Sequence, residues 1–545
     1  MRVLLGPVVA LSLWAHAGAA SADTAADIAT LDRLFSQWSG AQTAGCAVGV
    51  ARPGEPTLLR GYGMADLADG VAIDAQTRFE VGSVSKQFVA AAVLTLVEEG
   101  RLSLDADIRR YFPQIPDYGA VITVDHLLNH TSGLRDWGFA AEIAGWPRTT
   151  RAMSNSDVLA LTARQRELNH APGADYSYTN TGYVLLAMLV EQVAGVSLAA
   201  FTQERFFGPL GMNDTGWRDD FRRVQPRRAV AYVESEAGWV ERMPFEDVYG
   251  DAALITSVGD LLIWNEALFA GRLSAFVTQH MMEQAQLSDG SELTYGRGLE
   301  VTTPNGVVQV SHGGAIGGYR AWLAHYPQTG LSVALACNAG DGVGVGLGAR
   351  QGRLVAEAFL PARAPDQTRA VRTNARAYAG LFVSNTTGLP LNFTVRNGAL
   401  LSAGGAALTP IAARRFTLGG NEYAFESPDR LRVRRSTGAV ETYRREAPVQ
   451  FNAAEAGEIE GCYRSAELDA GYQAAIEDGA LVLRLEDRPG TAFTLAPLHK
   501  DAWTYDTRFG PRTAIVAVVR AEGGAVQALR IGWNGRIRGV LFSRC

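Results

Sequence analysis

A serine and a lysine stand three residues apart in the segment Ser83-Val84-Ser85-Lys86, and the chain has only one further lysine, Lys500. The other strongly basic side chains are arginines. An arginine stays protonated at any ordinary pH, whereas a lysine that is removed from water can lose its proton and act as a base. Because residues three apart share one face of a helix, we predict that Ser83 is a nucleophile and Lys86 its activating base.

The segment from Lys86 to Glu99 predicts a helix that ends near Gly100. Its body, residues 88–97, is apolar on almost every side, which is typical of a helix inside a core. A Ser-x-x-Lys segment also occurs by chance, with the serine as a helix cap and the lysine in solvent, but a buried helix disfavours that alternative. The backbone N–H groups at the start of the helix could also stabilise an oxyanion.

Two more segments carry polar groups that could complete such a site. In the first, the Tyr178 phenol could relay protons if a nearby ammonium lowered its pKa, and the Asn180 amide could donate to a substrate carbonyl. In the second, His312 precedes Gly313 and Gly314, where the backbone can approach a ligand closely. Taken alone, the first segment is better explained by a turn with core aromatics, and the second by a solvated histidine.

Ser-x-x-Lys, Tyr-x-Asn and His-x-Gly, in this order, resemble the motifs of the penicillin-recognising serine hydrolases, and most closely their class C β-lactamase-like branch. Three further stretches are similar to that family, namely residues 123–134, 209–212 and 250–257. The resemblance covers about residues 30 to 360. It implies an α+β fold, in which an antiparallel sheet is flanked by helices and carries an inserted helical subdomain, with the active site between the two.

The resemblance implies a role for each matching residue. Ser83 attacks the substrate carbonyl, while Lys86 and Tyr178 share the proton transfers, in a division that is disputed for related enzymes. Asn180 orients the substrate amide. Neither a metal nor an organic cofactor is expected.

The third motif supplies the opposite side of the implied site. The backbone N–H groups of Ser83 and of Ala315, which follows Gly314, form the oxyanion hole, and His312 lines the wall. Many family members carry a lysine where this chain has His312, and that lysine meets a substrate carboxylate. A histidine is charged only part of the time, so the change disfavours a β-lactamase or D,D-carboxypeptidase and fits an aminopeptidase or an esterase.

The composition changes after the predicted hydrolase domain. Residues 360–374 are rich in Pro, Arg, Ala and Thr, as in a linker. Beyond them, Gly380-Leu-Phe-Val-Ser384 resembles Gly461-Cys-Tyr-Arg-Ser465, and residues 397–400 resemble residues 478–481 at the same offset of 81 positions. Chance matching of glycine-rich turns is the alternative to two copies of one β-unit, each a small antiparallel barrel or sandwich. The predicted divisions are a signal peptide (1–22), the hydrolase domain (23–362), a linker (363–373) and two β-barrel domains (374–455 and 456–545).

The N-terminus is typical of a secretory signal, with Arg2, an apolar run over residues 3–14 and the cleavage pattern Ala20-Ser21-Ala22. It predicts a secreted or periplasmic protein; a retained anchor is the alternative. Export would permit disulfides. Cys462 opens the last β-unit and Cys545 ends it, and the first and last strands of a closed barrel are neighbours, so we predict a bridge between them. For Cys46 and Cys337, buried free thiols and a bridge both stay open.

The complete layout resembles the D-aminopeptidase members of the family, in which a loop of the last barrel reaches into the active site and an acidic residue there binds the substrate's free amino group. The matching loop here is Lys500–Pro511, and Asp506 is the candidate. An exposed loop aspartate is the alternative.

We therefore expect a serine hydrolase that releases N-terminal D-amino acids from peptides or amides and that a β-lactam could acylate. The first alternative is an esterase or a β-lactamase- or D,D-peptidase-like hydrolase with the same centre, acting on a small ester, amide or peptide. The second is a non-catalytic protein that binds cell-wall ligands. A net charge of −6 without a basic cluster disfavours a nucleic-acid-binding protein. No membrane span is expected in the mature form. A homodimer is possible.

Overall fold

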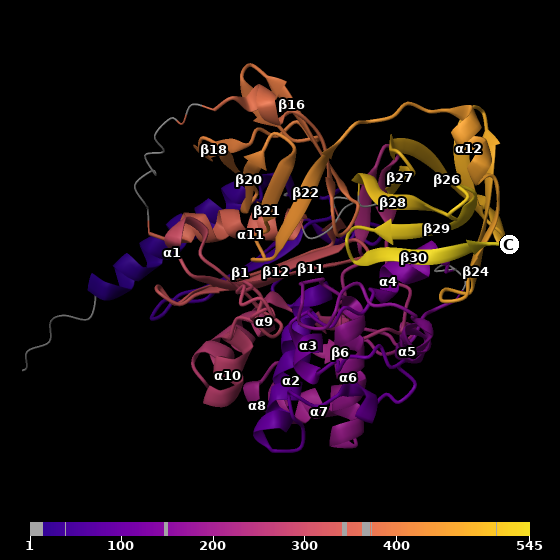
Figure 1. Ribbon diagram of the computed structural model, residues 1–545. Coiled ribbons are helices and arrows are strands. Elements are labelled where there is room, and N and C mark those ends of the chain that lie inside the picture. Colours follow the sequence, from indigo (N-terminus) through magenta and orange to yellow (C-terminus); the bar gives the residue numbers. More distant parts are fainter. Residues whose placement is uncertain are drawn as a thin grey trace, which may run out of the picture.

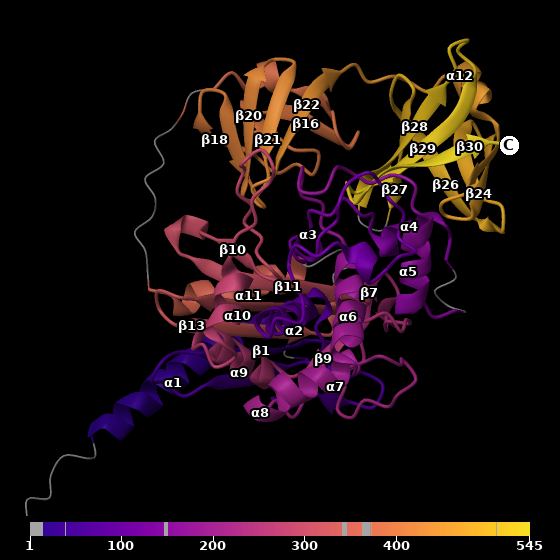
Figure 2. The ribbon, with the colours of Figure 1, turned by 60° about the horizontal axis from the view of Figure 1, so that its bottom comes forward.

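The computed structural model describes residues 15–38, 40–146, 151–340, 346–361, 371, 373–507 and 510–545. Three parts follow one another along the chain, namely a mixed helix–sheet domain, an eight-stranded antiparallel sheet and a closed β-barrel. Figure 2 shows the two β-units side by side on the same side of the mixed domain. Most of the predicted linker, residues 363–373, lies outside the described residues.

A six-stranded antiparallel sheet forms the centre of the first domain. From edge to edge its strands are β10 (Glu300–Thr302), β11 (Gln309–Ile316), β12 (Tyr319–Tyr326), β13 (Leu331–Cys337), β1 (Cys46–Ala51) and β2 (Leu58–Tyr62). Strand β11 begins at Gln309 and continues through His312, so this histidine lies inside the sheet and not in a turn.

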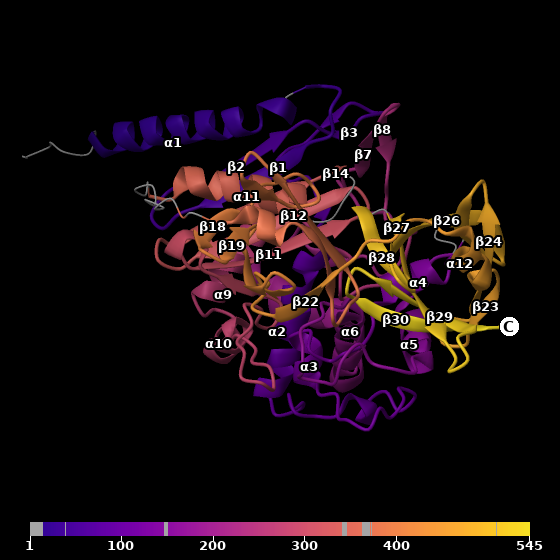
Figure 3. The same cartoon turned by 45° about the horizontal axis from the view of Figure 1, so that its top comes forward.

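Helices cover both faces of this sheet, as Figure 3 shows, with α1 on one side and α2 and α9 on the other. Strand β1 has the alternation that two buried faces require: Ala47 packs with helix α2, while Val48 packs with α1 and α11. The covering helices are α1 (Ala15–Leu34), α2 (Lys86–Glu98), α9 (Val258–Phe269), α10 (Ala275–Met282) and α11 (Gly346–Phe359).

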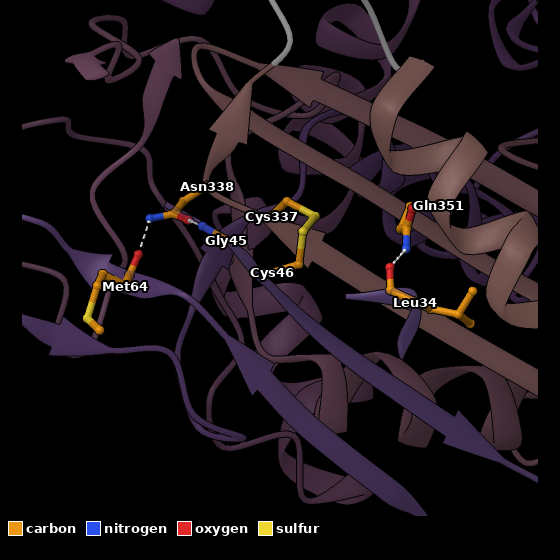
Figure 4. The surroundings of a disulfide bond; sticks show 7 residues. All are labelled: Leu34, Gly45, Cys46, Met64, Cys337, Asn338 and Gln351. Atoms are coloured by element: carbon orange, nitrogen blue, oxygen red, sulfur yellow. Dashed lines mark hydrogen bonds between the residues drawn. A yellow bond between two sulfur atoms is a disulfide. The ribbon is translucent and has the colours of Figure 1, made fainter. Parts of the chain in front are cut away.

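A disulfide joins two strands of the central sheet. Cys46 of β1 and Cys337 of β13 are direct partners in the antiparallel register, and their sulfurs are bonded in the buried layer beneath α1 and α11 (Figure 4). The two alternatives left open for these cysteines are thereby resolved in favour of the bridge. It connects positions 291 residues apart, so it ties the N-terminal strand to the end of the domain.

The inserted subdomain is mainly helical, and its long helix α6 packs against α2 in one continuous core. Its helices are α3 (Val124–Leu128), α4 (Trp137–Ile143), α5 (Asn155–Arg164), α6 (Asn180–Ala194), α7 (Leu198–Thr202) and α8 (Gly208–Leu210). Short strands form three smaller sheets around it, namely β3 (Met64–Asp66), β4 (Val71–Ala72), β5 (Phe79–Glu80), β6 (Gly216–Trp217), β7 (Tyr232–Ser235), β8 (Gly238–Glu241), β9 (Leu254–Thr256) and β14 (Ala339–Gly340).

The first β-unit is an antiparallel sheet in the order β17-β16-β15-β22-β21-β20-β19-β18. Its edges approach where the Leu408 N–H donates to the Leu400 carbonyl, 2.8 Å apart, so the sheet is strongly curved rather than a fully paired barrel. The strands are β15 (Gly380–Ser384), β16 (Pro390–Arg396), β17 (Ala399–Leu401), β18 (Thr409–Ala412), β19 (Arg415–Leu418), β20 (Asn421–Ser427), β21 (Arg430–Arg434) and β22 (Val440–Glu446).

The second β-unit closes completely, and the repeated sequence stretches occupy equivalent places in both units. They form the first strand, β15 or β23, and the turn after the second strand, where Asn397 and Asp478 both have positive φ. The predicted Cys462–Cys545 disulfide is confirmed next to the closing pair of β23 and β30. The barrel contains β23 (Gly461–Ser465), β24 (Ala470–Glu477), β25 (Ala480–Leu485), β26 (Arg488–His499), β27 (Ala502–Thr507), β28 (Gly510–Arg520), β29 (Val526–Trp533) and β30 (Ile537–Arg544), preceded by α12 (Ala453–Ile459).

The barrel and the helical subdomain share one hydrophobic core. Side chains of α4 and α5, among them Phe139, are buried together with barrel residues, and the Phe139 ring centre lies 5.6 Å from that of Trp533. A buried ion pair between Arg135 and Glu467 crosses the same interface. Figure 1 shows the barrel strands beside α4. The barrel is therefore packed against the elements that surround the candidate site.

The apolar run predicted as a signal, residues 3–14, lies outside the described residues, and helix α1 continues through the predicted cleavage site. Within the described ranges, no single helix is long and apolar enough to cross a membrane. One bent pair, Asn180–Ala194 with Leu198–Leu210, satisfies the length and composition criteria together, at an angle of 77°.

Candidate active site

The predicted nucleophile and base stand where a short 3₁₀ turn, Gly82–Ser85, runs into helix α2. Ser83 is partly exposed, whereas Lys86, one turn further along, is fully buried. The apolar sequence of α2 buries this helix in the core, and Lys86 is buried with it. Burying a charged lysine costs free energy, so the packing of the helix must offset that cost. The predicted desolvation of Lys86 is therefore present in the structure.

Lys86 Nζ lies between three oxygens. They are Ser83 Oγ at 3.1 Å, Asn180 Oδ1 at 2.8 Å and the backbone carbonyl oxygen of Asp251 at 2.8 Å. Two of the three can only accept a hydrogen bond, and the third is a hydroxyl that can also donate. A neutral amine has two N–H donors and one lone pair, and it satisfies this arrangement completely. Lys86 can thus accept the Ser83 proton without any rearrangement.

Burial lowers the pKa of Lys86 to about 7, and Arg536 acts in the same direction, while Asp251 and Asp136 oppose it. Burial likewise raises the pKa of the Asp251 carboxyl to about 7 against the attraction of Lys86. Trp137 Nε1 donates to Asp251 Oδ2 at 3.1 Å, but Asp251 Oδ1 is buried without a hydrogen-bond partner. The two groups titrate as a pair close to neutral pH.

Tyr178 lies beside Lys86, whose Nζ is 5.0 Å from the centre of the phenol ring. Burial raises the pKa of this tyrosine, and a hydrogen bond with Ser83 and the charge of Arg536 oppose that increase only in part. The condition named from the sequence, a pKa lowered by a nearby ammonium, is therefore not met, because burial outweighs the nearby positive charge. Tyr178 stays a protonated phenol near neutral pH and can donate its proton.

Asn180 is fixed at the first turn of α6. Its backbone N–H donates to Asp136 Oδ2 at 2.8 Å, and the other oxygen of Asp136 accepts from the first turn of α4. One carboxylate therefore aligns the starts of two helices. Because Asn180 Oδ1 accepts from Lys86, its Nδ2 group is oriented away from the lysine and is available for a substrate carbonyl.

The predicted oxyanion donors, the backbone N–H groups of Ser83 and Ala315, lie on two segments that touch. Gly82 has a φ of +52°, and a Cβ atom on it would stand 2.6 Å from the Ala315 nitrogen. A Cβ on Gly314 would stand 1.9 Å from the Val81 carbonyl oxygen and 3.2 Å from the Ser83 nitrogen. Both positions require glycine, and the close approach places the Ser83 and Ala315 backbone nitrogens on adjoining segments, as an oxyanion hole would require.

His312 lines the far wall from strand β11, but it is buried, at 3% exposure, and neutral. Burial lowers its pKa to about 3, with a further contribution from Lys86. Its Nδ1–H donates to the Gly313 carbonyl at 2.7 Å, so Nε2 accepts from the Tyr295 hydroxyl at 3.0 Å. Because burial keeps the ring neutral, His312 offers no cation for a substrate carboxylate.

Asp506 is an exposed residue of β27, two positions before the start of 508–509, which lie outside the described residues. Its proposed contact with a substrate ammonium stays a prediction. Among the described residues, the turn between β29 and β30 brings the barrel to the catalytic cluster, since the Arg536 guanidinium carbon lies 4.5 Å from the centre of the Tyr178 ring.

Four contributors were not predicted from the sequence: Asp136, Asp251, Tyr295 and Arg536. Asp251 lies in the family-like stretch 250–257, and Asp136 follows another, so their position next to a motif was an available signal. Among the described residues, the only grouping of three ligand-type side chains is Cys462, Glu486 and Cys545. Its two sulfurs form a disulfide, which leaves no set of donors for a metal.

Known proteins are similar to this chain at two levels. The family model described as "Beta-lactamase" matches residues 31–357. The D-aminopeptidase of Cereibacter sphaeroides (strain KD131) is 29% identical over 510 residues, which cover 90% of this chain and 94% of that protein. The second similarity therefore extends through both β-units.

Two solved structures share the fold. The D-amino acid amidase from Ochrobactrum anthropi SV3, complexed with L-phenylalanine amide, has a TM-score of 0.54 at 24% identity and covers 61% of this chain and 98% of its own. The octameric penicillin-binding protein homologue from Pyrococcus abyssi has a TM-score of 0.52 at 18% identity and covers 97% of this chain and 100% of its own.

Proposed function

The chain belongs to the beta-lactamase family and is a serine hydrolase of the penicillin-recognising type, and we propose that it releases N-terminal D-amino acids from short peptides or amides through an acyl-enzyme on Ser83. The observation that carries the chemistry is the set of three oxygens around Lys86 Nζ, which fits a neutral amine beside a serine hydroxyl. The substrate class is supported by the relative named D-aminopeptidase, which matches the hydrolase domain and both β-units.

Acylation begins when neutral Lys86 accepts the Ser83 proton and Oγ attacks the substrate carbonyl carbon. The negative charge that develops on the carbonyl oxygen is received by the backbone N–H groups of Ser83 and Ala315. Asn180 Nδ2 donates to a carbonyl of the substrate and fixes its direction. Each of these groups is held by the backbone or by a buried partner, so little reorganisation is needed during the reaction.

The leaving amine needs a proton, and the Tyr178 phenol, which stays protonated near neutral pH, can supply it. Tyr178 then recovers a proton from the Lys86 ammonium, which returns the lysine to its neutral state. In deacylation a water molecule gives its proton to Lys86, attacks the acyl carbon and releases the D-amino acid, while Ser83 Oγ regains a proton. The cycle leaves no net change on the enzyme.

The experiment that tests this function measures the hydrolysis of D-alanine p-nitroanilide, of its L-enantiomer and of its N-acetylated form. We expect turnover of the D-amide with a free amino group and a large loss for the other two. The Ser83→Ala variant should abolish both turnover and labelling by a fluorophosphonate probe. A wild-type protein that is not labelled would support the non-catalytic alternative. Equal turnover of the free and N-acetylated amides would overturn the aminopeptidase assignment.

An esterase is the second candidate, and the neutral state of His312 favours it over a β-lactamase or a D,D-carboxypeptidase, because strand β11 offers no cation for a substrate carboxylate. Hydrolysis of short-chain p-nitrophenyl esters far above that of any D-amino acid amide would support the esterase. Labelling of Ser83 by a penicillin probe would show only that a β-lactam can reach the nucleophile.

Recognition of the free amino group is assigned to Asp506 as a further part of the proposal. An ammonium needs a carboxylate partner when it leaves water, so Asp506→Asn should raise KM for D-alanine p-nitroanilide and leave kcat nearly unchanged. A matched substitution of an exposed aspartate elsewhere, Asp429→Asn, should have no effect. Unchanged KM in the Asp506 variant would remove this residue from the site.

A secreted or periplasmic location is also proposed, on the signal-like residues 2–22 and on the two disulfides, which persist in oxidising compartments. N-terminal sequencing of the protein exported by a bacterial host should find Asp23 as the first residue. An uncleaved chain that stays in the cytoplasm would contradict this location.

A further inference from the structure

Arg536 brings a positive charge from the C-terminal barrel to the catalytic cluster. Its guanidinium carbon lies 4.5 Å from the centre of the Tyr178 ring and 5.4 Å from that of Phe139. Its side chain is about 30% exposed, so a ligand can reach it from solvent. The cation therefore lies beside the residue that we assign to the leaving group, at the open side of the site.

The backbone of the turn that carries Arg536 is held in place. Asn534 and Gly535 both have positive φ, a conformation that an Asn-Gly pair adopts at low cost in hairpin turns. The Arg536 carbonyl accepts from Asn169 Nδ2 at 2.8 Å, and the Gly535 carbonyl accepts from Ser177 Oγ at 3.4 Å. Two residues further on, Arg538 forms an ion pair with a carboxylate of the hydrolase domain at 2.8 Å. The turn is thus clamped onto the segment that carries Tyr178.

The guanidinium has donors to offer. Its ion-pair partner among the described residues is Asp136, whose Oδ2 lies 3.7 Å from Nη1, beyond hydrogen-bond distance. Asp136 already accepts three backbone hydrogen bonds at the starts of α4 and α6. Within the part of the chain that the structure describes, no side-chain N–H of Arg536 makes a hydrogen bond. The charge of Asp136 holds the guanidinium in place while its N–H groups stay available.

A guanidinium with available donors is the preferred partner of a carboxylate, which it binds in a two-pronged geometry. In the proposed mechanism Tyr178 protonates the leaving amine, so the leaving group lies next to Tyr178 and to Arg536. When the leaving group is a single amino acid, the carbon of its carboxylate is only two bonds from the scissile nitrogen. That short reach matches a cation packed on the Tyr178 ring, whereas neutral His312 offers none.

We propose that Arg536 forms a carboxylate subsite for the leaving group, so that the enzyme prefers D-aminoacyl dipeptides with a free C-terminal carboxylate over the corresponding amides. This inference rests on the proposed function and specifies its substrate class. The C-terminal barrel then contributes to specificity, because it supplies the side chain that binds the leaving group.

The test compares kcat/KM for D-alanyl-glycine and D-alanyl-glycinamide, which differ only in the terminal carboxylate. The wild-type enzyme should prefer the free acid by about tenfold to a hundredfold, the range that a charged hydrogen bond supports. Arg536→Gln should remove this preference mainly through KM for the acid, and Arg536→Lys should restore part of it. The charge of Arg536 also acts to lower the pKa of Lys86 and of Tyr178. That effect is the same for both substrates, so it cancels in the ratio of their kcat/KM values.

The matched control is Arg530→Gln, which removes another barrel arginine from the same interface, where it pairs with Glu167 at 2.7 Å. It should keep the wild-type ratio. Equal kcat/KM for both peptides in the wild-type enzyme, or an unchanged ratio in Arg536→Gln, would overturn the subsite. If D-alanine p-nitroanilide is still cleaved in that case, the proposed function survives; if no D-alanyl amide is cleaved, both proposals fail.

Discussion

The pair formed by Lys86 and Asp251 predicts how the pH dependence of acylation responds to one substitution. Lys86 acts as a base only when neutral, so kcat/KM should rise with pH through the pKa of this lysine, which burial lowers to about 7. Asp251 is the largest influence that opposes this decrease. Replacing it by asparagine removes a negative charge that favours the ammonium, so the pKa of Lys86 should fall further.

The size of the shift follows from the charge that is lost. At an effective dielectric constant of about 20, a unit charge at roughly 4–8 Å contributes about 2–4 kcal/mol, or about 1.5–3 pKa units. Burial raises the pKa of Asp251 itself to about 7, so this group carries only part of its charge near neutrality. We therefore expect Asp251→Asn to move the acid limb downward by about one pH unit. At about pH 6 the neutral fraction of Lys86 would rise from about a tenth to about half.

The assay is the pH profile of kcat/KM with D-alanine p-nitroanilide, because this parameter reports the ionisations of the free enzyme. Asp260→Asn is the matched control. Asp260 is also a buried carboxyl whose pKa burial raises, but it bonds Thr215 at 2.7 Å, outside the catalytic cluster. The control should keep the wild-type midpoint. An Asp251→Asn enzyme that is folded and active, with an acid limb unmoved or moved to higher pH, would refute the assignment of Lys86 as the base.

Three further predictions concern stability, each measured by urea unfolding. Tyr295→Phe leaves the buried Nε2 of His312 without a donor and should lower the free energy of unfolding by about 1–3 kcal/mol; a loss well below this would mean that another donor replaces the hydroxyl. Cys337→Ser breaks the bridge between β1 and β13 and should cost about 2–5 kcal/mol, and the same stability with and without reductant in the wild type would contradict that. Arg135→Met leaves the buried Glu467 carboxylate without its ion-pair partner and should lower the free energy of unfolding by about 3–5 kcal/mol. The barrel should then separate from α4 at a lower urea concentration than in the wild type. An unchanged urea midpoint for the barrel would refute this prediction.

Features that depend on local sequence were predicted correctly. The apolar stretch after Lys86 specifies a buried helix in any context, and it places the lysine in the core. The matching stretches that begin with Asn-Gly at 397 and Asp-Gly at 478 are likewise local signals, and both form turns. Lys86 is one of only two lysines in the chain, and its burial agrees with the role of a base that the sequence predicts for it.

Features that depend on neighbours from distant parts of the chain could not be predicted in the same way. Whether a phenol has a lowered or a raised pKa depends on the balance between burial and nearby charge, and for Tyr178 burial prevails. The hydrogen bonding of His312 Nε2 depends on Tyr295, which lies in the loop before strand β10. Arg536 follows an ordinary hairpin turn, and only the docking of the barrel brings it to the site.

The docking of the barrel and the chemistry at Ser83 are connected through Asp136. Its backbone N–H donates to the Arg536 carbonyl at 3.4 Å, and its carboxylate holds the Asn180 backbone at the start of α6. Asn180 in turn holds Lys86 through a 2.8 Å hydrogen bond. The position of the base therefore depends on contacts that begin on the last hairpin of the chain. A barrel that was only an accessory domain would not need this connection, whereas one that selects the leaving group must keep its register with the nucleophile to within hydrogen-bond tolerance.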